Sequence, residues 1–150
     1  MEDKTPVVLF KKVSDTPYIP TRATSGSAGF DLFADLQTSY TKIAPGDTGM
    51  IRTGLAVAIP DGYFGAIFAR SGLATKYGIR PANCVGVIDS DYRGEIVMAL
   101  HNDSDTTYVV ENGERVAQMV ILPYLKTKFV EADELPETVR GGGGFGSTGT

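Results

Sequence analysis

The sequence is poor in the side chains that most zinc sites and nucleophilic triads use. It contains one cysteine, Cys84, and one histidine, His101, and it has no tryptophan. A single thiol cannot form an intrachain disulfide, which favours a reducing intracellular compartment: the cytoplasm, or the nucleus if the source is eukaryotic or viral. A zinc site of nitrogen and sulfur ligands needs more of both residues, and a histidine-based triad would depend on His101 alone. We assign neither Cys84 nor His101 a functional role.

Long apolar runs and clusters of positive charge are also missing. No stretch approaches the ~18 apolar residues that cross a bilayer, and the charged start at 1–5 lacks the apolar core of a signal peptide. Lysine and arginine number 14 against 18 aspartates and glutamates, a net charge of −4. Binding to a nucleic-acid backbone requires a basic footprint, so we expect neither nucleic acid nor membrane as a partner. One small phosphorylated ligand needs only a local cluster of positive charge.

What the chain does contain is a pattern of short strands. Its 150 residues fit one domain. Alternating apolar residues predict strands at 55–59, 64–68 and 96–100, and a nearly continuous apolar run predicts another at 116–122. Turn signals lie between them, and only residues 71–77 indicate a short helix. The sequence therefore predicts an all-β sandwich or barrel.

Several of these strands are apolar on both faces. Alanines at 56, 58 and 99 occupy positions that a simple sandwich would leave in water. Either these small residues are tolerated outside, or a second surface is buried against partner chains. We favour an obligate oligomer.

The end of the chain is rich in glycine. Residues 140–150 hold six of the 18 glycines, four of them consecutive. Because glycine loses the most backbone entropy on ordering, we expect this tail to be mobile until a ligand binds it. An arginine, an aromatic ring and two hydroxyls on such a chain suit a lid over a nucleotide, although a disordered tail is the simpler reading.

Five segments carry polar groups where a purely structural strand would not place them. They are Ala-Gly-Phe-Asp-Leu at 28–32, Ala-Arg-Ser-Gly-Leu-Ala at 69–74, Asn-Cys-Val-Gly-Val-Ile-Asp-Ser-Asp-Tyr-Arg-Gly at 83–94, Arg-Val-Ala-Gln-Met-Val-Ile at 115–121 and the tail from 140. The third segment reads as strand, turn and strand, which predicts a β-hairpin with acids at its tip. Each segment has a structural alternative: Asp31 as a turn or capping residue, Ser71 as a helix cap, residues 89–91 as a solvated turn, and Gln118 as an amide bonded to a neighbouring strand.

Taken in order, the five segments resemble the motifs of the trimeric dUTPases, the deoxyuridine 5'-triphosphate nucleotidohydrolases. The match runs from residue 28 to residue 149. The resemblance implies a jelly-roll-like β fold that assembles as a homotrimer, with each active site built from all three chains and closed by a C-terminal arm. It also implies Mg²⁺-dependent hydrolysis of dUTP to dUMP and pyrophosphate. The implied division of the chain is a β domain at 1–138 and an arm at 139–150 that closes a neighbour's site.

The resemblance also implies roles for individual residues. Asp89 would activate the attacking water, and Asp31 would hold Mg²⁺ through a coordinated water. Asn83 and the backbone through Gly86 and Val87 would read uracil, and Tyr92 would exclude a 2′-hydroxyl. Phosphate contacts and ring stacking would come from the remaining motif residues: Arg70, Ser71, Gly72, Gln118, Arg140, Phe145, Gly146, Ser147 and Thr148.

Two positions depart from the family's pattern, and two other functions stay open. Gly142 stands where Ser or Thr is common, and Ala69 where Pro is common. A dCTP deaminase-like enzyme would share the fold and would release ammonia in place of pyrophosphate. A non-catalytic dUTP-binding trimer would use the arm to signal to a protein partner.

Overall fold

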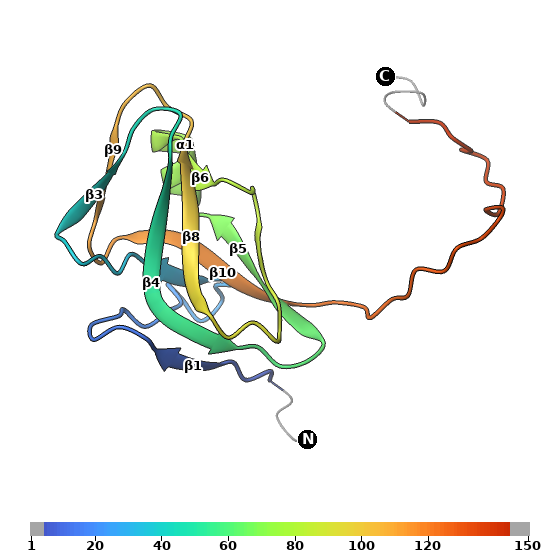
Figure 1. Cartoon of the computed structure of the whole chain (residues 1–150), viewed down its shortest axis with the longest axis horizontal. Coiled ribbons are helices and arrows are strands. Elements are labelled where there is room, and N and C mark those ends of the chain that lie inside the picture. The colour runs from blue at the N-terminus through green and yellow to red at the C-terminus, as the bar shows by residue number, and fades with distance from the viewer. Residues whose placement is uncertain (1–4, 145–150) are drawn as a thin grey trace.

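Two four-stranded antiparallel sheets form the body of the chain in the computed structural model, which describes residues 5–144 (Figure 1). The first sheet has, in spatial order, β1 (Leu9–Lys12), β4 (Thr48–Ala58), β8 (Glu95–Asn102) and β6 (Ile79–Pro81). The second has β2 (Phe30–Phe33), β10 (Arg115–Pro123), β5 (Tyr63–Ala69) and β7 (Gly86–Ile88). A small third sheet pairs β3 (Tyr40–Ile43) with β9 (Tyr108–Glu111). One helix, α1 (Ser71–Tyr77), follows β5.

A continuous apolar core draws on strands of all three sheets. Leu32 and Val116 come from the second sheet and Ile51 and Leu100 from the first, and each is at most 1% exposed. Burying one such side chain stabilises the fold by about 1.5–3 kcal/mol. The expected all-β, jelly-roll-like architecture is confirmed, and α1 has the predicted bounds.

The predicted hairpin at 83–94 is wrong in its pairing. β7 pairs with β5 in the second sheet, while β8 pairs with β4 and β6 in the first. The segment after β7 therefore crosses from one sheet to the other instead of turning back on its own strand. The reason is long-range: β5 and β4 offer buried apolar partners that a local pairing of β7 with β8 would forfeit.

A register shift in β4 requires a glycine. The pairing of β4 with β8 slips between Arg52 and Ala56, and Gly54 lies there with φ of 67°. A side chain at this position would collide with the carboxylate of Asp35 and the hydroxyl of Ser14, which hydrogen-bond to each other. The left-handed backbone and the lack of space both exclude other residues.

The doubly apolar strands have two explanations in the structure. Leu55, Ala56 and Val57 are all buried within the single chain, so both faces of this part of β4 are already covered. Met50 and Val97, by contrast, are 66% and 38% exposed on β4 and β8. The single chain thus leaves part of its apolar surface in solvent, and this part is available to a partner.

Beyond β10 the chain leaves the body as a long extended segment (Figure 1). Its first residues are tied down: the Tyr124 N–H donates to the carbonyl of Gly62 at 3.0 Å, and Lys126 pairs with Asp61 at 2.6 Å. The rest, through residue 144, is exposed or partly exposed, including fully exposed Phe129. The expected domain boundary at 138/139 falls inside this segment.

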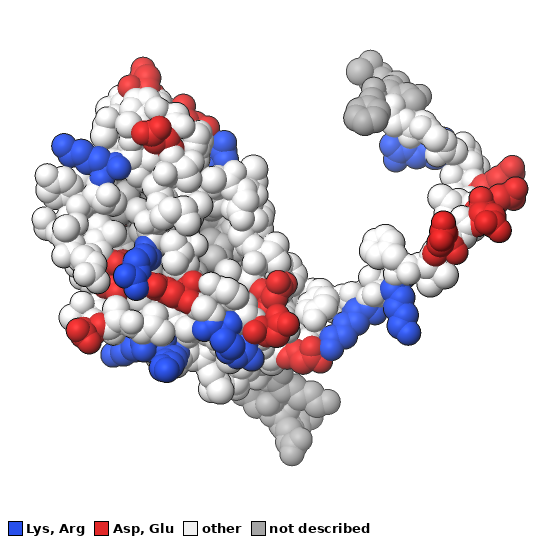
Figure 2. All heavy atoms as spheres, viewed as in Figure 1, with Lys and Arg blue, Asp and Glu red and all other residues white. Residues whose placement is uncertain are grey.

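Charges of both signs are mixed on the surface. On the face drawn in Figure 2, basic side chains lie among acidic ones on the body, and acids gather along the extended segment. In the described part of the chain, no helix is both long and apolar enough to cross a membrane.

Candidate functional site

A carboxylate held between two guanidinium groups forms the first half of the candidate site. Arg70 Nε donates to Asp31 Oδ1 at 3.1 Å, and Arg115 Nη1 donates to Oδ2 at 3.3 Å. These residues lie far apart in sequence, but β2 and β5 both pair with β10, which brings them together. The Asp31 side chain is only 13% exposed, while those of Arg70 and Arg115 are 29% and 49% exposed. The cluster carries one net positive charge at the surface.

Gln118 lies beside this cluster on the same sheet. Gln118 lies on β10, directly opposite Asp31 of β2, and its Nε2 donates to the carbonyl of Ala69 at 3.0 Å. The expected structural bond to a neighbouring strand is therefore present. An amide nitrogen has two donors, so one remains for a ligand. Gly29 allows this packing, because a Cβ there would lie 2.7 Å from Gln118 Oε1.

Ser71 and Gly72 form the first residues of α1, directly after Arg70. No side chain caps this helix start, no acid lies in its first turn, and the space around Gly72 is open. The capping role considered for Ser71 is thus absent. The segment presents a hydroxyl and backbone N–H groups next to the Asp31 cluster.

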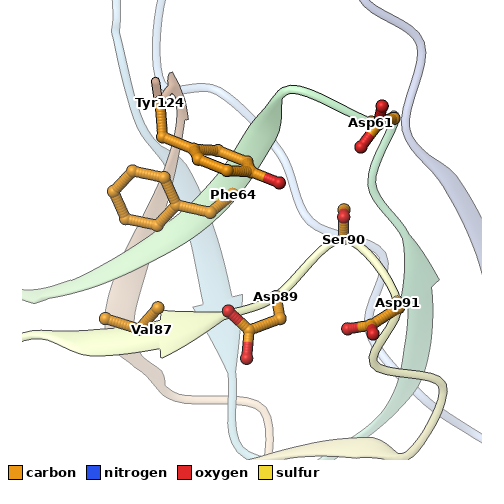
Figure 3. Close-up of a pocket in the computed structure, with 7 residues that line it drawn as sticks. All are labelled: Asp61, Phe64, Val87, Asp89, Ser90, Asp91 and Tyr124. Carbon is orange, nitrogen blue, oxygen red and sulfur yellow. The ribbon is translucent and has the colours of Figure 1, made fainter. Parts of the chain in front are cut away.

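The second half of the candidate site is a cavity of about 710 Å³ beyond β7. Asp89 and Asp91 line it from the segment after β7, and Asp61 lines it from the turn between β4 and β5 (Figure 3). The rings of Phe64 and Tyr124 form an apolar wall, with their centroids 6.4 Å apart. An exposed carboxylate at the edge of such a cavity suits a base that acts on water.

Several contacts fix the turn that carries Asp89 and Tyr92. The Tyr92 N–H donates to the Asp89 carbonyl at 3.2 Å, and Arg93 Nη1 donates to the carbonyls of Ser90 and Tyr92 at 2.6 and 2.9 Å. The Tyr92 hydroxyl donates to the Glu95 carbonyl at 3.0 Å. The Tyr92 ring lies over Gly94, where a Cβ would come within 2.6 Å of Cζ. The ring is thereby held in one place.

Glu95, which accepts the Tyr92 hydroxyl through its carbonyl, is itself anchored to β4. Its carboxylate accepts from Arg52 Nε at 2.9 Å and from the Gly54 N–H at 2.8 Å. Partial burial raises the pKa of this carboxyl. The hydrogen bonds from Arg52 and Gly54, together with the charge of Arg52, lower the pKa by more than burial raises it. The net pKa is below the ordinary value for glutamate.

The residues expected to read a base lie around β7. Asn83 is exposed in the turn before this strand, and its carbonyl accepts from the Val85 N–H at 2.7 Å. Gly86 and Val87 pair with Ile67 and Ala66 of β5. The Val87 side chain is 59% exposed and lines the Asp89 cavity.

The two halves lie at opposite ends of β5. Ile88 pairs with Gly65, so Asp89 lies near the start of β5, whereas Arg70 follows its end. The six residue-to-residue steps from Phe64 to Arg70 correspond to about 20 Å of extended chain. This length exceeds that of a triphosphate, so Asp89 and Arg70 of one chain cannot act on the same phosphate group.

Arg140 belongs to the extended segment that follows β10, and this segment runs away from the body of the chain (Figure 1). Its Nε donates to the Gly143 carbonyl at 2.8 Å within a local turn. At Gly142 a Cβ would meet no atom of residues 5–144 within 4 Å, so this part of the chain does not require glycine there. Phe145, Gly146, Ser147 and Thr148, expected to contact substrate, lie outside the described residues.

The side chains of this site could hold a metal ion only if most of the ion's ligands were waters or substrate oxygens. Within residues 5–144, no group of three or more His, Cys, Asp and Glu side chains is arranged to hold an ion. Asp31 accepts from two arginines, but a carboxylate has about four lone-pair sites, which leaves room for a water. Mg²⁺ keeps several waters and often binds substrate phosphates, so this cluster fits a hydrated Mg²⁺ brought by a nucleotide.

Sequence reasoning missed several residues of the site. The sequence pattern gives Arg115 no role, because its contact with Asp31 depends on the pairing of β10 with β2. Gly94 and Glu95 fix Tyr92, while Asp61 and Tyr124 complete the Asp89 cavity. Of these residues, only Gly94 could have been found from the local sequence, because a glycine two residues after Tyr92 suggests that the ring needs space there.

The chain matches known proteins over nearly its full length. Residues 16–149 match the family model for dUTPase. The deoxyuridine 5'-triphosphate nucleotidohydrolase of Desulfitobacterium hafniense is 52% identical over 143 residues, which cover 95% of this chain and 94% of that protein. The corresponding protein of Hydrogenobaculum is 48% identical over 95% of this chain and 97% of its own length.

Solved structures give the same relationship. The dUTPase of Staphylococcus bacteriophage 80alpha, solved with dUPNHPP, superposes with a TM-score of 0.85 at 28% identity, over 96% of this chain and 99% of that one. A mutant dUTPase of phage phi11 of S. aureus, which coordinates a structural Mg(II) ion, has the same fold (TM-score 0.77, 23% identity, 87% and 99% coverage). With the motifs, the fold and these matches in agreement, the chain belongs to the dUTPase family.

Proposed function

We propose that this protein hydrolyses dUTP to dUMP and pyrophosphate, which limits uracil incorporation into DNA and supplies dUMP for dTTP synthesis. The proposal rests on the presence of two features together in a chain of this family. One is an exposed carboxylate, Asp89, at a nucleotide-sized cavity, and the other is a net positive cluster around Arg70.

Asp89 acts as the general base. Its carboxylate accepts a proton from a water molecule as the water oxygen attacks the α-phosphorus of dUTP. The bond from the α-phosphorus to the bridging oxygen breaks, and pyrophosphate leaves with the electron pair of that bond. A base positioned in this way contributes about 10²–10⁴-fold to the rate. The hydrogen bonds around residues 89–93 support this role, because they fix the backbone of the turn that carries Asp89.

Selection of the deoxyuridine moiety falls to the segment around β7. Asn83 and the backbone at Gly86 and Val87 pair with the uracil edge, so a cytosine would leave polar groups unpaired, and the methyl group of thymine would clash. Unpaired polar groups discriminate more strongly than a missing methylene does. Tyr92 lies under the deoxyribose, and its fixed ring leaves no room for a 2′-hydroxyl.

The triphosphate binds to the Arg70 side of the sheet. Hydrogen bonds to phosphate oxygens come from Arg70, from the Ser71 hydroxyl and from the backbone of Ser71 and Gly72. The second amide donor of Gln118 supplies another. Arg140, Ser147 and Thr148 add further contacts when the arm closes, with Phe145 stacked on the base and Gly146 allowing the approach.

Mg²⁺ is the proposed cofactor, and Asp31 holds it through a coordinated water. When bound, the ion neutralises the phosphate oxygens and aligns the triphosphate. The two arginines on Asp31 support this outer role, since they keep the carboxylate fixed and leave acceptor sites free.

The active site is shared between the subunits of a homotrimer. The separation of Asp89 from Arg70 along β5 supports this arrangement, because a single chain cannot bring both to one phosphate. The exposed apolar residues Met50 and Phe129 also support it, since a trimer would cover them. The extended arm from each chain then reaches a neighbour's site.

A pyrophosphate-release assay with dUTP, dTTP, dCTP and UTP, with and without Mg²⁺, tests the proposal. We expect release from dUTP alone, and only with Mg²⁺. Asp89→Asn should keep binding of dUTP, measured by calorimetry, and lose turnover. Ammonia release from dCTP would indicate a deaminase, and binding of dUTP without turnover by the wild-type protein would indicate a regulatory trimer.

A further inference from the structure

Asp31 is the shared partner of two arginines, and only one of them belongs to the residues proposed above to bind phosphate. Arg70 and Arg115 each donate to a different oxygen of this carboxylate, at 3.1 and 3.3 Å. Arg70 follows β5 and Arg115 begins β10, and the side chain of Arg70 donates to the Arg115 carbonyl, so the two residues are neighbours. The carboxylate therefore bridges two neighbouring cations.

The charge of the cluster depends on Arg115. Asp31 and Arg70 by themselves form a neutral pair, and a neutral pair attracts a polyanion weakly. Arg115 adds one positive charge, and its side chain is 49% exposed, so the charge is accessible to a ligand. Because Asp31 is largely buried, solvent screens this part of the cluster less than it screens a surface ion pair.

Both arginines also keep N–H donors that no described residue uses. Arg70 uses Nε on Asp31 and Nη1 on the Arg115 carbonyl, at 3.2 Å. Arg115 uses Nη1 on Asp31. A guanidinium has five N–H donors, and no described residue accepts from Nη2 of either arginine, so each keeps donors for phosphate oxygens.

We infer that Arg115 is a second cationic phosphate-binding residue, which supplies the net positive charge of the Asp31 cluster. This inference rests on the proposed function and names a further residue of the same site. Its side chain acts on the pyrophosphate part of the substrate and has no contact with the nucleoside.

The test compares Arg115→Gln with Arg52→Gln. Arg52 is a matched control, because it also pairs with a mostly buried carboxylate, Glu95, and its side chain is 47% exposed. Binding of inorganic pyrophosphate and of deoxyuridine is measured by calorimetry at two salt concentrations, and KM and kcat are measured with dUTP. We expect Arg115→Gln to weaken pyrophosphate binding and raise KM about tenfold, since charge-assisted hydrogen bonds are lost.

Deoxyuridine binding should stay within about twofold of wild type in Arg115→Gln, and pyrophosphate binding should depend less on salt. Arg115→Lys, which keeps the charge, should retain most of the pyrophosphate affinity, and Arg52→Gln should leave the pyrophosphate affinity unaffected. Unchanged pyrophosphate affinity in Arg115→Gln overturns the inference, and so does an equal loss for both ligands. Because calorimetry needs no turnover, these outcomes are independent of a failure of the wild-type protein to hydrolyse dUTP.

Discussion

At the scale of single residues, the position of the Tyr92 ring is decided by its neighbours. The hydroxyl is bound to the Glu95 carbonyl, and the lack of a side chain at Gly94 leaves the space in which the ring lies. A hydroxyl that already donates its proton to the protein cannot also donate it to the sugar. We therefore expect discrimination against a ribose by Tyr92 to depend on the shape and position of the ring.

Gly94→Ala tests this view of sugar selection. The added Cβ would lie within 2.6 Å of Cζ of Tyr92 and displace the ring. We expect the ratio of kcat/KM for dUTP over UTP to fall about tenfold, in the direction expected for Tyr92→Ala, with the fold retained. Gly26→Ala is the control, since a Cβ there meets no atom within 4 Å. A selectivity ratio in Gly94→Ala equal to that of Gly26→Ala would show that the ring need not be fixed.

At the scale of elements, the strands bring together residues that are distant in sequence. β10 runs between β2 and β5 and so places Gln118 and Arg115 next to Asp31 and Arg70. The ion pair of Arg52 with Glu95 links β4 to β8 next to the register shift at Gly54. This link holds the segment that carries Tyr92.

Glu95→Gln should destabilise the protein in a pH-dependent way. The pKa of Glu95 is lowered in the folded state, so its ionised form stabilises the fold above the ordinary value of 4.5, and this contribution is lost as the pH falls. We expect a loss of about 1–2 kcal/mol at pH 7 that shrinks below pH ~4, measured by urea unfolding at one protein concentration. Asp61→Asn breaks the ion pair with Lys126, in which the Asp61 carboxylate is 75% exposed, so this change should affect stability much less. A loss that is constant between pH 7 and pH 3.5 would contradict the assignment.

The extended arm provides the second prediction at this scale. Deleting residues from Arg140 onward removes no strand and no core residue of the described chain. We expect a folded protein with the wild-type oligomeric state and about 100-fold lower kcat/KM for dUTP, because arm contacts to the phosphates are lost. Circular dichroism, light scattering and the pyrophosphate assay measure these three properties. An active truncation would remove the arm from the mechanism.

At the scale of the whole molecule, the two halves of the site lie too far apart to cooperate within one chain. Asp89 lies near the start of β5 and Arg70 follows its end. We infer that the fold of one chain presents two incomplete half-sites. Assembly through the exposed apolar surface would join each half to the complementary half of another copy.

Mixing two inactive variants tests the sharing of the site. Asp89→Asn and Arg70→Gln should each be nearly inactive alone. When they are unfolded, mixed in equal amounts and refolded, about a quarter of the sites receive both intact residues if they come from different copies of a symmetric oligomer. We expect activity near a quarter of that of refolded wild type. Activity that stays at the level of the single variants would mean that each chain carries a complete site.

The sequence by itself determined the strands around 55–59, 64–68, 96–100 and 116–122, the helix and the motif residues, because these depend on local periodicity and residue chemistry. The alternation along 96–100 and the helix at 71–77 are examples, and both have the predicted structure. Only the tertiary structure decided that β7 pairs with β5, that Arg115 meets Asp31, and that Asp89 and Arg70 lie at opposite ends of a strand. The physical reason is that strand pairing is a competition among distant segments for buried partners, and no local window of sequence records its outcome.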